Sequence, residues 1–281
     1  VRQSLYTTAI RSYRSRKLAA QGAARQRNLL AMYQRLSDTY AKRLDFDVLH
    51  VVVQQNLLPF LWKGGYLGGR TFEVLMTALP MNELQKTLDI AAKRWPESTT
   101  LGDFRAEAWL VEAETAALQH AKRIITPHAY IASLFRSRAD LLSWKVPESE
   151  LRPAPNNPKP VIVFPASTVG RKGCYELREG IRDLDVKLLT LGPYIESADF
   201  WRGFDVERAG EEWLDRADLV VLPAHVEHRP RRLLSAASRG IPVIATPNCG
   251  LPESDGVYLT PAGDAKALRQ EISQFIESRD K

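Results

Sequence analysis

Two adjacent basic residues, Arg171 and Lys172, stand between an expected strand and an expected helix. The apolar run Val161–Phe164 predicts a buried strand, and residues 173–182 predict the helix that follows. In an open α/β sheet, ligands bind in the loops after the carboxyl ends of strands. Cations at a helix start are unfavourable for the helix dipole, so the pair predicts a bound anion such as a diphosphate. The alternative is two solvated surface cations.

A second loop could hold another part of the same ligand. The expected strand Leu219–Leu222 is followed by a loop that carries Glu227, and Pro230 is suited to the first turn of the next helix. A carboxylate in such a loop can accept hydrogen bonds from sugar hydroxyls, and the amides at the helix start suit a phosphate. Glu227 could instead be a solvated loop carboxylate. His225, Glu227 and His228 lack the H-E-x-x-H spacing of a metal site, so we expect no metal ion there.

The two loops together resemble the donor-binding half of GT-B glycosyltransferases of the retaining kind, in the family-4 and family-1-like groups. The resemblance extends over about residues 122–253. It includes Lys172-Gly173, Glu227 as the first Glu of an E-x7-E element, the G-I-P-V-I-A-T segment at 240–246 and the C-G-L-P-E turn at 249–253. It implies two Rossmann-like domains of GT-B type. Such enzymes usually carry further strands ahead of the position of Asp47, and these are not visible here, so we expect a first domain that is short or incomplete.

The same resemblance implies an activity. The chain would move a sugar from a nucleotide-diphosphate donor to a hydroxyl acceptor, with retention of configuration and without a metal ion. Arg171 and Lys172 would neutralise the charge on the leaving diphosphate, and Glu227 would hold the sugar. The remaining candidate residues for donor or substrate binding are His128, Thr168, Gly170, His228, Arg229, Pro230, Arg231 and Ser235.

The sequence departs from the family pattern at two positions. The second Glu of E-x7-E falls on Ser235, and the Arg usually found about five residues before the Lys falls on Ser167, for which Arg171 could substitute. Ser235 can hydrogen-bond to ribose but carries no charge. A second hypothesis is therefore a catalytically inactive glycosyltransferase-like protein that binds a ligand or serves as a scaffold.

Proline and the apolar pattern divide the chain. Residues 147–160 contain five prolines and predict a linker between an acceptor-side domain at 1–146 and a nucleotide-sugar-binding domain at 161–281. Short apolar runs that alternate with helical segments predict parallel sheets in an α/β fold. The expected strands are 47–53, 70–79, 122–127, 161–164, 186–191, 219–222, 243–246 and 257–259. The expected helices are 56–62, 82–93, 103–120 with Asp103 as N-cap, 129–135, 173–182, 207–216, 231–239 and 265–277.

The net charge of +6 is concentrated at one end. Residues 1–43 hold ten of the 39 Lys and Arg residues and one of the 33 acidic residues. Their apolar residues recur at helical spacing, so we expect amphipathic helices with a basic face. That face either is solvated or contacts an anionic membrane surface, and we expect no nucleic-acid partner.

The remaining expectations follow from composition and from the proposed donor. Two cysteines and the lack of a long uncharged apolar run favour a cytoplasmic protein, with the inner membrane face as its alternative location. We expect no cofactor besides the nucleotide-sugar substrate. The acceptor would be a carbohydrate, a lipid or a small molecule with a hydroxyl group.

Overall fold

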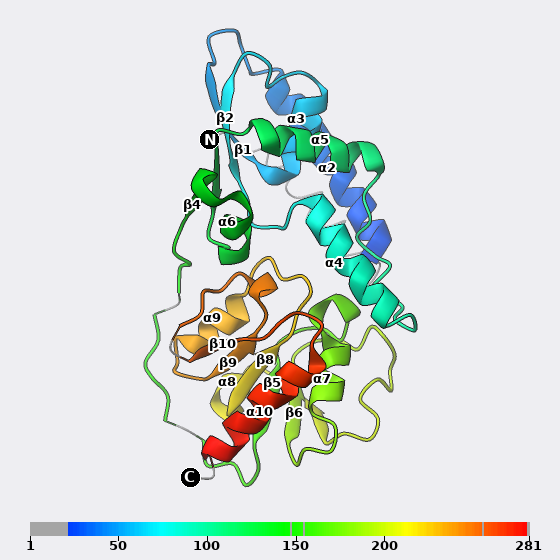
Figure 1. Cartoon of the computed structure of the whole chain (residues 1–281), viewed down its shortest axis with the longest axis vertical. Coiled ribbons are helices and arrows are strands. Elements are labelled where there is room, and N and C mark those ends of the chain that lie inside the picture. Colours follow the sequence, from blue (N-terminus) through cyan, green and yellow to red (C-terminus); the bar gives the residue numbers. More distant parts are fainter. Residues whose placement is uncertain (1–21, 147, 154, 255, 280–281) are drawn as a thin grey trace.

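The computed structural model describes residues 22–146, 148–153, 155–254 and 256–279, which form two α/β domains, one above the other in Figure 1. The first domain has a four-stranded sheet with the order β1-β2-β3-β4, and all neighbouring strands are parallel. Its strands are β1 (His50–Gln54), β2 (Thr71–Leu75), β3 (Arg123–Thr126) and β4 (Ala139–Leu141). Its α-helices are α2 (Gly22–Ala41), α3 (Leu58–Lys63), α4 (Met81–Arg94), α5 (Ala108–His120) and α6 (Ala129–Phe135).

The second domain has a six-stranded parallel sheet with the order β10-β9-β8-β5-β6-β7. Its strands are β5 (Val161–Phe164), β6 (Lys187–Thr190), β7 (Val206–Arg208), β8 (Leu219–Leu222), β9 (Val243–Ala245) and β10 (Val257–Leu259). Its α-helices are α7 (Cys174–Gly180), α8 (Trp213–Arg216), α9 (Arg231–Ala237) and α10 (Ala265–Arg279), and a short 3-10 helix, η3 (Gly170–Lys172), precedes α7. Strands β5, β8 and β9 are buried along their whole length, as expected for a sheet covered on both faces.

The strand order places a switch point between β5 and β8. From β5 the chain adds β6 and β7 on one side of the sheet, and it then returns to add β8, β9 and β10 on the other. The connections after β5 and β8 therefore lead away in opposite directions and leave a crevice at their carboxyl ends, where doubly wound sheets bind ligands. The expected two-domain α/β fold with parallel sheets is confirmed.

Several local predictions differ from the structure, and the strand expected at 70–79 ends at Leu75. Residues 207–216 form the edge strand β7 and then α8, because Glu207 is held between Arg216 and Lys187 in an extended segment beside β6. Helix α5 begins at Ala108 after Glu107, since residues 103–107 are irregular, and Asp103 is not its N-cap. The three-residue edge strand β4 was not predicted.

Part of the basic N-terminal segment is described. Residues 1–21 lie outside the described residues, so the expectation of an amphipathic helix is observed only for α2. Met32 and Ala41 of α2 are buried, and the Ser37 hydroxyl donates to the Leu57 carbonyl at 3.3 Å. No helix in the described part of the chain is long and apolar enough to cross a membrane.

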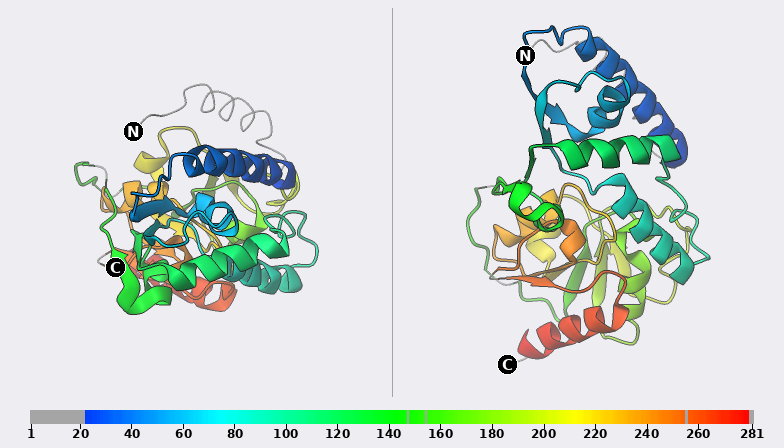
Figure 2. Two further views of the ribbon diagram at one scale, coloured as in Figure 1. Left: turned by 90° about the horizontal axis from the view of Figure 1, so that it is seen from above. Right: turned by 45° about the horizontal axis from the view of Figure 1, so that its top comes forward.

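Residues that flank the crevice fasten the two domains together. The buried Glu196, in the loop after β6, accepts hydrogen bonds from the Ser98 hydroxyl at 3.0 Å and the Thr99 amide at 2.9 Å in the first domain. Within its own domain it accepts the Gly170 amide at 2.6 Å. The turn that carries Arg171 is thereby linked to the first domain, and Figure 2 shows α4 extending from that domain along one side of the second.

Gly173 allows the loops after β5 and β8 to lie close together. It adopts a left-handed conformation with φ of +75°, and a Cβ there would lie 2.0 Å from the Pro223 carbonyl oxygen. Only a residue without a side chain fits this contact.

We predict that Gly173→Ala destabilises the second domain more than Gly203→Ala does. Gly203 also has a positive φ, of +90°, but a Cβ there meets no atom within 4 Å. Both changes should cost about 1–2 kcal/mol for the backbone conformation, and Gly173→Ala about 1–3 kcal/mol more for the clash. Urea unfolding monitored by tryptophan fluorescence measures both variants, and equal losses would contradict the close approach at Pro223.

Candidate functional site

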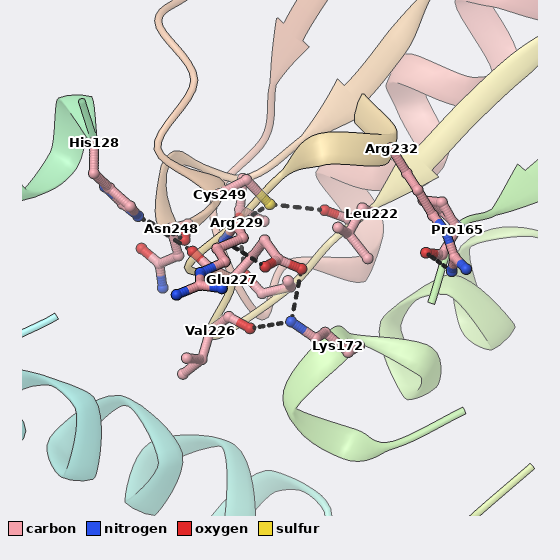
Figure 3. A network of polar contacts seen from close by, with 12 residues as sticks. His128, Pro165, Lys172, Leu222, Val226, Glu227, Arg229, Arg232, Asn248 and Cys249 are labelled. Atoms are coloured by element: carbon pink, nitrogen blue, oxygen red, sulfur yellow. Dashed lines mark hydrogen bonds and ion pairs between the residues drawn. The ribbon is translucent and has the colours of Figure 1, made fainter. Parts of the chain in front are cut away.

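The two candidate loops meet through an ion pair. Lys172 ends η3 after β5, and Glu227 lies in the loop after β8. The Lys172 ammonium donates to Glu227 Oε2 at 2.7 Å and to the Val226 carbonyl at 2.8 Å (Figure 3). The other carboxylate oxygen of Glu227 accepts a hydrogen bond from the Arg229 backbone N–H, with an N–O distance of 2.8 Å. The expected convergence of Lys172 and Glu227 on one crevice is observed.

The pair is largely shielded from water. The side chains of Lys172 and Glu227 are 13% and 16% exposed, so neither is the solvated surface side chain that the alternative interpretations assumed. The reason is the close approach of the two loops, which closes over the ammonium group. Burial alone would raise the pKa of Glu227, but the Lys172 charge and the hydrogen bonds it accepts lower that pKa to below its ordinary value. Glu227 is therefore ionised at neutral pH.

A basic cavity of about 280 Å³ lies beside this pair at the switch point. Its walls come from the loop after β5, the end of β8 and the start of α9. Among the predicted residues it contains Arg171, Lys172, Glu227, Arg229, Pro230 and Arg231; the other lining residues are Pro165, Ala166, Ser167, Val169, Leu222, Arg232 and Leu233.

A second cavity of about 500 Å³ lies between the domains. The first domain lines it with α2, α4 and the segments after β1 and β2, through apolar side chains and the polar residues Gln26, Tyr33, Asn56 and Thr77. It shares Arg171, Lys172, Glu227 and Arg229 with the basic cavity. The ion pair thus stands at the border between a basic cavity and a larger, more apolar one.

His228 lines the cavity between the domains, and one of its ring nitrogens is buried without a hydrogen bond. Its Nε2 atom has no hydrogen-bond partner among the described residues. Burial, followed by the nearby Lys172 charge, lowers the pKa of His228 to about 3. The ring is therefore neutral at physiological pH and can donate or accept one hydrogen bond at this atom, depending on its tautomer.

His128 supports the Glu227 loop from the first domain. Its ring is the N-cap of α6, where Nδ1 accepts the Ile131 amide, and its Nε2 lies 3.3 Å from the Glu227 carbonyl and 3.2 Å from the Asn248 carbonyl. The residue is buried, and burial lowers its pKa. It does not line either cavity, so its contact with the site is through the backbone of the loop.

Three further predicted residues lie away from the cavity walls. The Gly170 amide is turned to Glu196, and the Thr168 hydroxyl accepts the indole N–H of Trp201 at 3.0 Å. Ser235 lies on α9 outside the lining of either cavity, and its carbonyl accepts the Ser238 hydroxyl at 3.1 Å. Helix α9 has only seven residues, and Pro230 is its N-cap, not its first helical residue.

Two residues near the site were not singled out from the sequence. Arg232 lines the basic cavity and donates to the Pro165 carbonyl at 2.8 Å. Its place in the run R-P-R-R could have drawn attention to it. Glu196 lies in a loop with no regular pattern, and its partners are about a hundred residues away, so the sequence offered no signal. No group of three or more His, Cys, Asp or Glu side chains within the described ranges is arranged to hold a metal ion.

Comparison with known proteins finds similarity in the second domain. Residues 169–278 match the family model described as "Glycosyl transferases group 1". The putative colanic acid biosynthesis glycosyltransferase WcaL of Escherichia coli (strain K12) is 28% identical over 131 residues, which cover 39% of this chain and 32% of that protein. The amylovoran biosynthesis glycosyltransferase AmsK of Erwinia amylovora is 31% identical over 109 residues, covering 34% and 27%. Each alignment therefore spans about a third or less of the relative's length.

Solved structures match nearly the whole chain. Sucrose-phosphate synthase from Thermosynechococcus elongatus aligns with a TM-score of 0.60 at 16% identity, covering 90% of this chain and 70% of that structure. The lipopolysaccharide outer core galactosyltransferase WaaB aligns with a TM-score of 0.57 at 15% identity, covering 90% and 72%. The fold is GT-B. At these identities the structural similarity establishes the fold only. The reaction must be inferred from the residues of this chain.

We predict that His228 stays neutral down to about pH 4. Its pKa in the folded protein is about 3, below the 6.5 of an unperturbed histidine. Between these two values the unfolded chain binds a proton that the folded protein does not bind. Unfolding free energy should therefore fall as pH decreases through this window, by at most about 1.4 kcal/mol per pH unit from this residue.

His228→Gln removes this contribution and should flatten the pH dependence of stability between pH 6.5 and 4. The measurement is urea unfolding at several pH values, together with the NMR signal of the His228 ring, assigned by its loss in the variant. A ring that titrates near pH 6.5, or identical pH profiles for the two proteins, would refute the prediction.

Proposed function

We propose that this chain transfers a sugar from a nucleotide-diphosphate donor to a hydroxyl acceptor. The single observation that carries the proposal is the position of the Lys172–Glu227 pair, at the border between the basic cavity and the cavity between the domains. A donor with its diphosphate in the basic cavity would have its sugar near this border. An acceptor in the interdomain cavity would approach the same point.

Each group at the border has a distinct role in the proposed reaction. Lys172 and Arg171 bind the diphosphate and neutralise the negative charge that develops as the sugar leaves. Glu227 uses one acceptor position for Lys172 and one for the Arg229 amide, and a carboxylate has about four. The remaining positions accept hydrogen bonds from the donor sugar. The basic side chains supply the positive charge that a metal ion supplies elsewhere, so we propose a metal-independent reaction.

Similar proteins support the choice of donor and reaction. A solved structure of HepE from Anabaena, which aligns with a TM-score of 0.54 at 13% identity, is described as a complex with UDP. WcaL and AmsK are named for the biosynthesis of colanic acid and amylovoran. We therefore propose a nucleoside diphosphate as the leaving group and a carbohydrate or a lipid- or small-molecule-linked hydroxyl as the acceptor.

The direct test begins with nucleotide binding. UDP, GDP and ADP are each added to the full chain, and at least one should raise its melting temperature through preferential binding to the folded state. Sugar derivatives of that nucleotide are then incubated with hydroxyl acceptors, and NMR of the product gives the anomeric configuration. Retention in the presence of EDTA is expected; inversion, or loss of activity on chelation, would contradict the proposed mechanism.

A second candidate function rests on Ser235. The side chain at this position of the family pattern is short and neutral, and it lies outside the lining of both cavities. A protein that binds the nucleotide without turning over any donor would be a glycosyltransferase-like binding protein. Tight nucleotide binding with neither transfer to acceptors nor hydrolysis of donors would favour this function.

We also propose that the basic segment at 1–43 contacts anionic membranes. Pelleting of the chain with vesicles of anionic lipid should decrease steeply between about 0.05 and 0.5 M salt, because exposed charges are screened over a Debye length. Neutral vesicles serve as the control. Binding that is absent, or that is insensitive to salt, would remove this part of the proposal.

We predict that Lys172→Met weakens nucleoside diphosphate binding. Loss of a charge-assisted contact of about 1.5–3 kcal/mol corresponds to a roughly 10- to 160-fold lower affinity. The change also leaves Glu227 without its cation, so stability should fall by about 3–5 kcal/mol. A Lys172→Met/Glu227→Gln double variant also removes the unpaired buried carboxylate. Its nucleotide affinity can then be measured by calorimetry on a more stable protein.

Lys187→Met is the matched control. Lys187 also forms a 2.7 Å ion pair, with Glu207, but on the far strands β6 and β7 and outside the cavities. The Lys187→Met variant should bind the nucleotide with the same affinity as the unmodified chain. Equal affinity for the double variant and this control would place the diphosphate elsewhere.

A further inference from the structure

The basic cavity has far more positive than negative charge. Five basic side chains and one carboxylate line it, and that carboxylate, Glu227, is bound to Lys172. Arg229, Arg231 and Arg232 form no ion pair with any described residue. A cavity with this balance favours a ligand with several negative charges over one with a single charge.

Arg232 spans this cavity from the helix side. It lies in the first turn of α9, and its Nη1 donates to the Pro165 carbonyl at 2.8 Å, directly after β5 (Figure 3). The guanidinium therefore links the two connections that diverge at the switch point. Within the described chain this is its one hydrogen bond, and a guanidinium has five N–H donors. The side chain is solvent-exposed, so a ligand can reach the remaining donors.

The opposite wall offers a hydroxyl in place of a charge. Ser167 lines the same cavity, two residues beyond Pro165. Its backbone packs closely against Gly192, where a Cβ would lie 2.6 Å from the Ser167 nitrogen and Cα. The Ser167 hydroxyl also lies beside Gly192, 2.8 Å from that added Cβ, and this lining residue of the cavity is short and uncharged.

We infer that Arg232 binds the diphosphate of the donor and supplies, from α9, the positive charge that Ser167 does not supply from the loop after β5. This inference rests on the proposed function and adds a residue to it. One N–H of the Arg232 guanidinium donates to the Pro165 carbonyl. Two of its other N–H groups donate parallel hydrogen bonds to phosphate oxygens. Arg232 is a binding residue for the leaving group, beside Lys172.

The test compares Arg232→Met, Arg232→Lys and the unmodified full chain by isothermal titration calorimetry. The probes are inorganic pyrophosphate, the nucleoside diphosphate with the largest thermal shift, and the corresponding nucleoside. Arg232→Met should weaken binding of both phosphorylated probes about 5- to 50-fold, since one charge-assisted contact at an exposed site is lost. Arg232→Lys should recover part of this loss, and nucleoside affinity should not change.

A rescue variant tests whether the two positions are equivalent. Ser167→Arg in the Arg232→Met background returns a guanidinium to the cavity from the other wall, and it should restore most of the pyrophosphate affinity. Arg239→Met is the matched control, because Arg239 follows α9 and pairs with Asp215 outside the cavity. Thermal unfolding of each variant verifies that the fold is intact.

The outcomes separate this inference from the proposed function. If the unmodified chain binds pyrophosphate or a nucleotide and Arg232→Met binds it equally well, the role of Arg232 is overturned and the proposed function stands. A loss of affinity that Ser167→Arg does not repair overturns the equivalence of positions 167 and 232. If the unmodified chain binds none of the probes, the proposed function and the inference fail together.

Discussion

The site depends on the divergence of two connections from neighbouring parallel strands. Strands β5 and β8 pair with each other, but the chain leaves them toward opposite sides of the sheet. The side chains of both following loops can therefore enter the crevice between their carboxyl ends. Lys172 and Glu227 meet there although 55 positions separate them in the sequence. Their attraction fixes the loops relative to each other, and each charge compensates the other in a poorly solvated place.

Elements with sharply bounded apolar runs could be predicted best from the sequence. Strands β5, β8 and β10 and helix α6 have the expected bounds, because their apolar runs are interrupted sharply by polar residues or proline. The edge strand β7 was expected as part of a helix. Its residues are half exposed, and its conformation depends on pairing with β6 and on the ion pairs of Glu207, which no local pattern reveals.

The candidate site was predictable to a similar extent. Arg171, Lys172 and Glu227 follow strand ends, so topology alone brings them to one edge of the sheet. The roles of Glu196 and Arg232 depend on where long side chains reach, and the sequence does not encode this in a periodic form. Glu196 connects the two domains, because it accepts hydrogen bonds from the first domain and from the Gly170 amide of the second. The geometry of the basic turn is therefore tied to the position of the first domain, not set by its own loop alone.

The missing side chain at Gly173 also limits how this crevice can be altered. The turn at Gly173 lies against Pro223 and has no room for one extra carbon atom. A larger residue at this position would therefore force the two loops apart. On the other wall, Arg229, Arg231 and Arg232 are exposed. Substitutions that alter ligand preference are therefore sterically easier at these exposed side chains than at Gly173.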